Sequence, residues 1–155
     1  MGQRARGLIG ATALAGAVCL AGCLGVAPPL TPVQATVELP AQARVSLQKV
    51  DGDILKFSVF NLSDKFLVVA RDEIVLTCSQ GTRRREPGGS TNFYTIPPGG
   101  EHAVNVRFSF AGIAAGETVT VAFDRALLRE GNPLPEHIAP VSLRVEESKT
   151  ESRAF

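Results

Sequence analysis

Apolar and polar residues alternate through most of the chain beyond residue 42, which is the pattern of β-strands that bury one face. This alternation predicts strands at 43–47, 54–62, 66–70, 74–78, 93–96, 102–110, 119–123 and 141–145. The run 102–110 has His, Val, Val, Phe and Phe at alternate positions, with small or polar residues between them. The run 54–62 is apolar at both sets of alternate positions, which predicts a central strand. No helical period competes with the alternation beyond residue 22.

Residues typical of tight turns separate these runs. Asp51-Gly52 predicts a β-hairpin, and Asn61-Leu62-Ser63-Asp64 has turn chemistry. Pro97-Pro98-Gly99-Gly100 matches a type II turn, because Pro98 presets φ and Gly99 can adopt a positive φ. We therefore expect an all-β fold, an antiparallel immunoglobulin-like sandwich of about 7 to 8 strands. A small closed barrel is the alternative.

The first residues have the composition of an export signal. Arg4 and Arg6 give a short positive segment, and residues 7–18 are uncharged and rich in Ala, Gly and Leu. The segment ends in Leu20-Ala21-Gly22-Cys23, which resembles the lipobox of bacterial lipoproteins. This resemblance implies that residues 1–22 are a cleaved lipoprotein signal peptide and that the Cys23 thiol carries a diacylglycerol. Several acyl chains on Cys23 would then attach the protein to the bilayer.

Two other interpretations of this segment remain open. No charged residue occurs between Arg6 and Glu38, which is compatible with an uncleaved transmembrane helix. Pro28 and Pro29 would end such a helix at the low end of the length needed to span a bilayer. The second is an ordinary secretory signal, which would leave Cys23 as a free thiol. The fit of four consecutive residues favours the lipobox over both.

The remaining chain divides into three parts. Residues 23–42, the lipidated Cys and four prolines, are predicted to form a tether that could span up to ~60 Å at about 3.1 Å per residue. Within it, 35–39 alternates in part and could instead dock as an edge strand. Residues 43–146 are the predicted β-sandwich domain. Residues 147–155 are charged and without alternation, which predicts a disordered tail.

The charge balance and the cysteine count exclude some kinds of function and of cross-link. The chain has 16 Lys and Arg against 15 Asp and Glu, and removal of residues 1–22 takes away Arg4 and Arg6 and leaves 14 against 15. Such a balance gives no field to attract nucleic acid. With Cys23 lipidated and Cys19 removed, Cys78 has no cysteine to pair with. Cys78 shares the face of apolar residues in 74–78, which predicts a small buried hydrophobe.

The three consecutive arginines Arg83, Arg84 and Arg85 are the candidate binding residues. They fall in 83–92, the longest polar insertion, where neighbouring side chains could splay around a phosphate or an acidic patch of a partner. The alternative is a solvated loop that keeps the flanking strands soluble and is partly neutralised by Glu86.

Candidate reactive chemistry is sparse. His102 and His137, each preceded by a glutamate, could form a metal site, although they lie far apart in the sequence and beside turns. The alternative is two ordinary polar residues at strand ends. A small hydrolase pairing Cys78 with a histidine is a third possibility. Otherwise no Ser/His/Asp arrangement, phosphate loop or zinc spacing occurs, so we predict neither catalysis nor a cofactor.

The turn at 96–100, the strand that ends in Phe108 and the turn at 61–63 resemble small immunoglobulin-like domains of uncharacterised bacterial lipoproteins. The resemblance covers roughly residues 43–146 and lacks the Trp and paired core cysteines of antibody domains. Because reactive residues are scarce, exposed loops and edge strands are the usable surfaces, and we expect a non-catalytic envelope lipoprotein that presents a β-sandwich to a protein partner. Leu24 stands where an inner-membrane retention signal has Asp, so in a diderm organism we expect the outer membrane, facing the periplasm.

Overall fold

The computed structural model describes residues 27–89 and 91–148, and within them the chain is all-β, as the alternation predicts. The strands are β1 (Leu30–Gln34), β2 (Thr36–Leu39), β3 (Ala43–Asp51), β4 (Ile54–Asn61), β5 (Leu67–Ala70), β6 (Val75–Cys78), β7 (Gly81–Arg84), β8 (Phe93–Ile96), β9 (Glu101–Arg107), β10 (Thr118–Ala122), β11 (Leu127–Arg129), β12 (Asn132–Pro133) and β13 (Val141–Val145). A single 3-10 turn, η1 (Arg71–Glu73), separates β5 from β6. No helix in the described part of the chain is both long and apolar enough to cross a bilayer.

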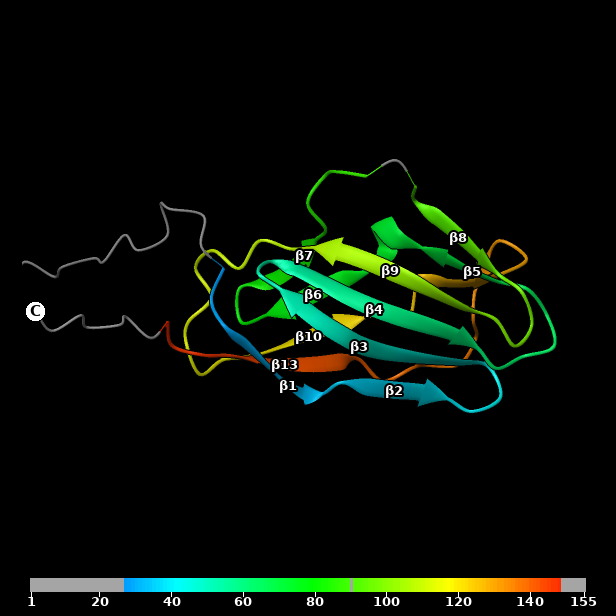
Figure 1. The fold of residues 1–155 in the computed structure, drawn as a ribbon, viewed down its shortest axis with the longest axis horizontal. Coiled ribbons are helices and arrows are strands. Elements are labelled where there is room, and N and C mark those ends of the chain that lie inside the picture. The colour runs from blue at the N-terminus through cyan, green and yellow to red at the C-terminus, as the bar shows by residue number, and fades with distance from the viewer. Residues whose placement is uncertain (1–26, 90, 149–155) are drawn as a thin grey trace, which may run out of the picture.

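The strands form three antiparallel sheets (Figure 1). Their orders are β1-β13-β10-β6-β7, β2-β3-β4-β9 and β12-β11-β5-β8. Because β5 leads into β6 through η1, and β10 leads into β11 through a short turn, the third sheet extends the first along the length of the molecule. Strands β3, β4 and β9 lie in front of them in Figure 1 and form the facing layer.

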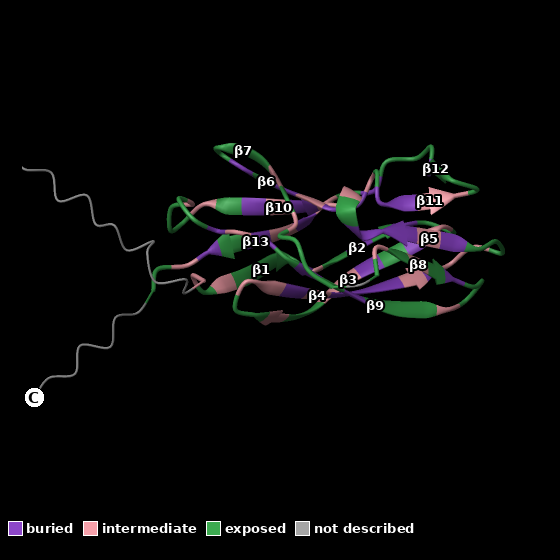
Figure 2. Cartoon of the chain, turned by 90° about the horizontal axis from the view of Figure 1, so that it is seen from above, coloured by how far each residue is buried: buried purple, intermediate pink, exposed green. Residues whose placement is uncertain are grey.

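The core lies between these layers. Phe57 of β4 meets Phe123, which directly follows β10, edge to face with ring centroids 5.0 Å apart. Both rings are almost fully buried, and burial of such a side chain contributes roughly 1.5 to 3 kcal/mol. In Figure 2 the buried residues concentrate along the strands, while the connecting loops are mostly exposed. The described chain thus buries one continuous apolar cluster.

Strand β4 is central, as predicted, with β3 on one side and β9 on the other. Its inward residues Leu55, Phe57 and Val59 are fully buried, and Ile54 and Phe60 on the other face are half-buried. The prediction for 102–110 is confirmed for its valines and phenylalanines, which are buried, although β9 ends at Arg107 and His102 is exposed.

The predicted tether is wrong for residues 30–39, which are part of the sheets. β1 pairs with β13, and β2 pairs with β3, so the alternative of a docked edge strand at 35–39 is confirmed and reaches back to Leu30. Val37 and Leu39 are buried, and this burial holds the segment in place. Pro32 sits on the edge strand β1 beside a register shift, a position where proline costs no ladder hydrogen bond.

Two other predictions of loop structure are wrong. β7 pairs with β6, so Arg83 and Arg84 lie on an edge strand rather than in a loop. The hairpin of β11 and β12 was not predicted, because its strands have only three and two residues and turn at Gly131, whose φ is 80°. Phe66, expected to begin a buried strand, precedes β5 and is exposed.

The predicted turns are confirmed, and two of them meet. Gly99 has a φ of 71°, and Gly100 N donates to the Pro97 carbonyl at 2.9 Å, as a type II turn requires. Asn61 N donates to the Gly100 carbonyl and Gly99 N donates to the Asn61 carbonyl. The signal peptide 1–22, the lipidation site Cys23 and residues 149–155 of the expected tail lie outside the described residues.

Candidate functional site

The three candidate arginines contact different parts of the molecule. Arg83 donates to the Ser109 carbonyl at 2.9 Å and to Gln80 Oε1 at 2.8 Å, so it ties the β6–β7 hairpin to the loop after β9. Arg84 is the exposed one, with only a 3.2 Å bond to the Asp72 carbonyl and a distant ion pair to Glu73. The side chains of Arg83 and Arg84 therefore have different partners and do not converge on one anion site.

Arg85 turns toward η1. Its guanidinium forms an ion pair with Asp72, and its Nη1 donates to the Gly88 carbonyl at 2.8 Å. Glu86, the residue expected to neutralise the arginines, forms no ion pair with them among the described residues. The partners come instead from η1, which β-sheet pairing brings beside β7.

A fourth arginine, Arg71, was missed by the sequence analysis. It is buried, with 8% of its surface exposed, and its Nη2 donates to the same Gly88 carbonyl that Arg85 contacts. A signal for it exists in the alternation, since Arg71 follows Leu67 and Val69 in the inward-facing series of β5. A charged residue in such a series is the unusual feature.

Beside Arg71 lies a cavity of about 220 Å³, here called the Arg71 cavity. Three arginines line it, Arg71, Arg85 and Arg107, together with Glu86, Asn105, Ile54 and the loop 87–89. Arg107 of β9 pairs with Asp53 at 3.1 Å. Glu86 N donates to the Arg107 carbonyl at 2.8 Å, which fixes the loop against the edge of β9.

The two histidines have separate partners. The ring centroids of His102 and Tyr94 are 4.5 Å apart. The His102 Nδ1 is 2.7 Å from the Ala103 carbonyl oxygen. His137 Nδ1 is 2.6 Å from Asp124 Oδ2. Within residues 27–89 and 91–148, no group of three or more His, Cys, Asp or Glu side chains could hold a metal ion. The metal alternative therefore has no ligand set in the described structure.

Cys78 is free and buried, with 9% of its surface exposed, as predicted from its position beside Leu76. It faces the core from β6, while both histidines are exposed on other elements. A buried thiol on an apolar face behaves as a small hydrophobic side chain. The hydrolase alternative requires a histidine beside Cys78, and in the described residues neither histidine lies there.

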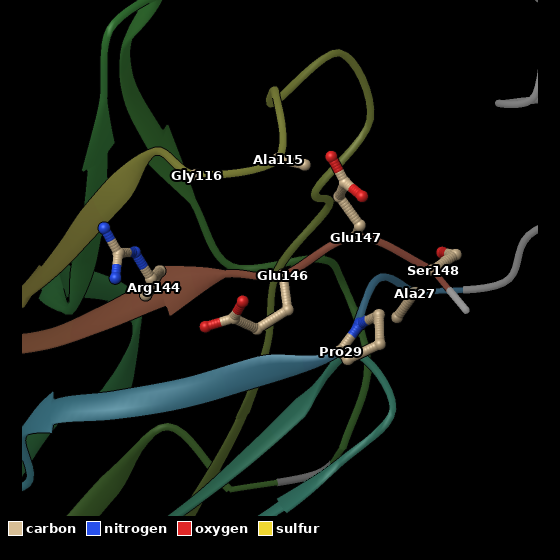
Figure 3. Close-up of a pocket in the computed structure, with 8 residues that line it drawn as sticks. All are labelled: Ala27, Pro29, Ala115, Gly116, Arg144, Glu146, Glu147 and Ser148. Atoms are coloured by element: carbon tan, nitrogen blue, oxygen red, sulfur yellow. The ribbon is translucent and has the colours of Figure 1, made fainter.

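A larger cavity, of about 910 Å³, lies between the start of β1 and the end of β13. Figure 3 shows Ala27 and Pro29 on one side, Ala115 and Gly116 on the other, and the charged Arg144, Glu146 and Glu147 between them. It is open to solvent and mixes charges of both signs. It occupies the end of the molecule where the described chain begins and ends (Figure 1).

An apolar surface lies on the outer side of the third sheet. Leu128, Val68 and Thr95 are cross-strand neighbours on β11, β5 and β8, and Pro133 adjoins Leu128 from β12. Residues opposite one another on antiparallel strands point to the same side. Phe93 lies two residues before Thr95 on β8 and points to the same side, and Phe66 directly precedes β5. Their side chains are 60% and 61% exposed, respectively. We call the set Phe66, Val68, Phe93, Leu128 and Pro133 the outer apolar face.

The outer apolar face and the large cavity lie at opposite ends of the molecule. In both Figure 1 and Figure 2, β5 and β8 are at the right, while the start of β1 and the end of β13 are at the left. Any segment that precedes Ala27 therefore joins the molecule far from Phe66 and Phe93.

The Arg71 cavity and the outer apolar face differ in their chemistry. Neither the Arg71 cavity nor the outer apolar face includes a cysteine, histidine or serine that could act as nucleophile or base. A guanidinium and an aromatic ring bind by charge and by burial of apolar surface. Comparison with protein-family models, curated proteins and solved structures finds no match to this chain.

Proposed function

We propose that this chain is a non-catalytic lipoprotein of the bacterial cell envelope that binds a protein partner. The lipobox at Leu20-Ala21-Gly22-Cys23 supports the envelope location, and the two facing antiparallel layers support an immunoglobulin-like sandwich as the binding module. Acylated Cys23 attaches it to the bilayer. In a diderm organism it faces the periplasm from the outer membrane, because Leu24 follows the cysteine.

The observation that carries the proposal is the exposure of two aromatic rings at the third sheet, Phe93 on β8 and Phe66 directly before β5. Exposed aromatic rings grouped with other apolar side chains are typical of protein-protein interfaces. Removing an apolar side chain from water contributes roughly 25 cal/mol per Å², and aromatic anchors dominate the binding energy of many interfaces. The outer apolar face therefore has the composition of an interface centre.

Its position favours a protein over a lipid surface as the partner. Ala27 is four residues after Cys23, and a chain of this length spans at most about 14 Å. The end of the domain that carries Ala27 therefore lies close to the bilayer in an acylated protein. The outer apolar face at the opposite end then points away from the membrane, where only a soluble or protruding partner can reach it (Figure 1).

Site-specific photo-crosslinking in intact cells tests this proposal. A crosslinking amino acid at position 95, in the row between Phe93 and Val68, is expected to join the full-length protein to a single partner. The double change Phe66→Ser, Phe93→Ser is expected to abolish that adduct. Val33→Ser is the matched control, because Val33 is equally exposed (63%) but lies on β1. Equal adduct formation in the double variant and the control would refute the proposal.

A further inference from the structure

We propose that the Arg71 cavity is a binding site for a small oxyanion, the carboxylate or phosphate group of a ligand. This inference is independent of the proposed protein partner and of lipidation. It rests on the burial of Arg71, on the lack of a carboxylate partner for it among the described residues, and on two further arginines that line the same space.

Among the described residues, the Arg71 guanidinium makes a single hydrogen bond. Its Nη2 donates to the Gly88 carbonyl, whereas its Nε is buried without a hydrogen-bond partner among the described residues. A buried charge that lacks an opposite charge costs several kcal/mol in a folded protein. An anion in the adjoining cavity would satisfy this guanidinium and remove most of that cost.

Two of the three nearby carboxylates are already paired with other arginines. Asp72 pairs with Arg85, and Asp53 pairs with Arg107. Glu86 lines the cavity but is exposed and forms no ion pair in the described structure. Each guanidinium has five N–H donors, so Arg85 and Arg107 keep donors for a ligand after pairing. Of the three arginines that line the cavity, only Arg71 has no ion pair with a carboxylate in residues 27–89 and 91–148.

The backbone of the loop 87–89 lies very close to the Arg71 guanidinium. Gly89 has a φ of 79°, and a Cβ at this position would lie 2.6 Å from Arg71 Nη2. Glycine at 89 therefore lets the backbone cover the guanidinium without displacing it. The Gly88 carbonyl accepts from both Arg71 and Arg85 and so holds the two guanidinium groups together at the cavity wall.

The dimensions and donors define the ligand class. The planar guanidinium fork matches the oxygen spacing of carboxylate and phosphate groups. A volume of about 220 Å³ is below the roughly 300 to 1,000 Å³ of sites for drug-sized ligands, so the cavity suits a small anion or the anionic end of a larger one. Binding would place that group beside Arg71.

The test uses the full-length protein in detergent, with inorganic phosphate and acetate as probes at an ionic strength held constant with chloride. We expect saturable binding with one site per chain by calorimetry, and a rise in Tm that saturates at the same concentration. The stronger of the two probes identifies the group as phosphate or carboxylate. The proposal is overturned if neither probe binds more than chloride does.

Three variants locate the site. Arg71→Met removes the buried charge and is expected to abolish anion binding at little cost in stability. Asn105→Asp places a carboxylate at the cavity wall and is expected to weaken binding about tenfold or more while raising the Tm of the anion-free protein. Arg84→Gln, which alters an exposed arginine outside the cavity, is the control and should bind as the native protein does. Native affinity in the Asn105→Asp protein would place the anion elsewhere and refute the site.

Discussion

The side-chain amide of Asn61 donates a 3.0 Å hydrogen bond to the carbonyl of Ile96, 35 residues further along the chain. Asn61 is fully buried, its Nδ2 also donates to the Lys65 carbonyl at 2.7 Å, and its Oδ1 accepts from Ser63 N. The end of β4 is thereby joined to the end of β8. The Asn61 side chain thus connects the turn after β4 to the turn after β8, and these two strands belong to different sheets.

Asn61→Ala is expected to lower the free energy of unfolding by about 2 to 4 kcal/mol, because it leaves two carbonyls without their donor and empties a buried site. Urea denaturation of the full-length protein in detergent measures this change. Asn132→Ala, which alters an exposed asparagine with one 3.4 Å contact, is the control and should change stability by less than about 0.5 kcal/mol. Equal effects of the two changes would contradict the role of Asn61.

Arg83 and Arg84 are neighbours with unequal roles. Arg83→Ser removes bonds to Ser109 and Gln80, so we expect a loss of about 1 kcal/mol in urea denaturation. Arg84→Ser affects an exposed side chain and should cost less than about 0.5 kcal/mol. If Arg84 contributes to capture of an acidic partner, its replacement will weaken capture most at low salt, where exposed charges are least screened. Equal stability losses in the two variants would contradict this division.

Glu117 connects the loop before β10 to the β6–β7 hairpin. The Ser79 backbone N–H donates to its carboxylate, and this bond, with the Ser79 side chain and Arg83, lowers the pKa of Glu117 below its ordinary value. A lowered pKa in the folded state means that the stabilisation is present above the pKa of the unfolded state and is lost as pH falls through the folded value. The loss is therefore confined to the acid range.

Glu117→Gln is expected to lower Tm at neutral pH, and its difference from the native protein should shrink as the pH falls below the ordinary pKa of a glutamate. Thermal unfolding followed by circular dichroism at a series of pH values measures the difference. Glu136→Gln, at an exposed position, controls for the loss of one negative charge. A Tm difference that stays constant down to the lowest pH would refute the assignment.

Lipidation at Cys23 is tested by metabolic labelling with palmitate. We expect label in the native protein and in Cys19→Ala, and none in Cys23→Ala, because Ala21 and Gly22 provide the small residues that the lipobox has before its cysteine. The labelled form should partition into detergent and, in a diderm host, fractionate with outer-membrane markers. Undiminished label in Cys23→Ala would sink the assignment, and fractionation with the inner membrane would contradict the location.

Features that depend only on neighbouring residues along the chain could be predicted from the amino-acid sequence. Alternation identified the inward faces of β4, β9 and β10, since successive residues of a strand point to opposite sides. Pro98 and Gly99 determined their turn through backbone dihedral preferences alone. Cys78 was correctly predicted to be buried, because its face is shared with Leu76.

Which segments pair and which polar groups meet depends on contacts between residues far apart in the sequence. Residues 30–39 become strands because β13 and β3 offer edges to them, and β7 forms against β6 although its own residues are polar. Arg71 and Arg85 meet at Gly88, and Phe93 and Val68 share an outer face, only after β5 pairs with β8 and the loop folds back. A period of two separates the faces of a strand but does not say which strand lies beside it. Distant residues come together through hydrogen bonds and burial that no local preference encodes.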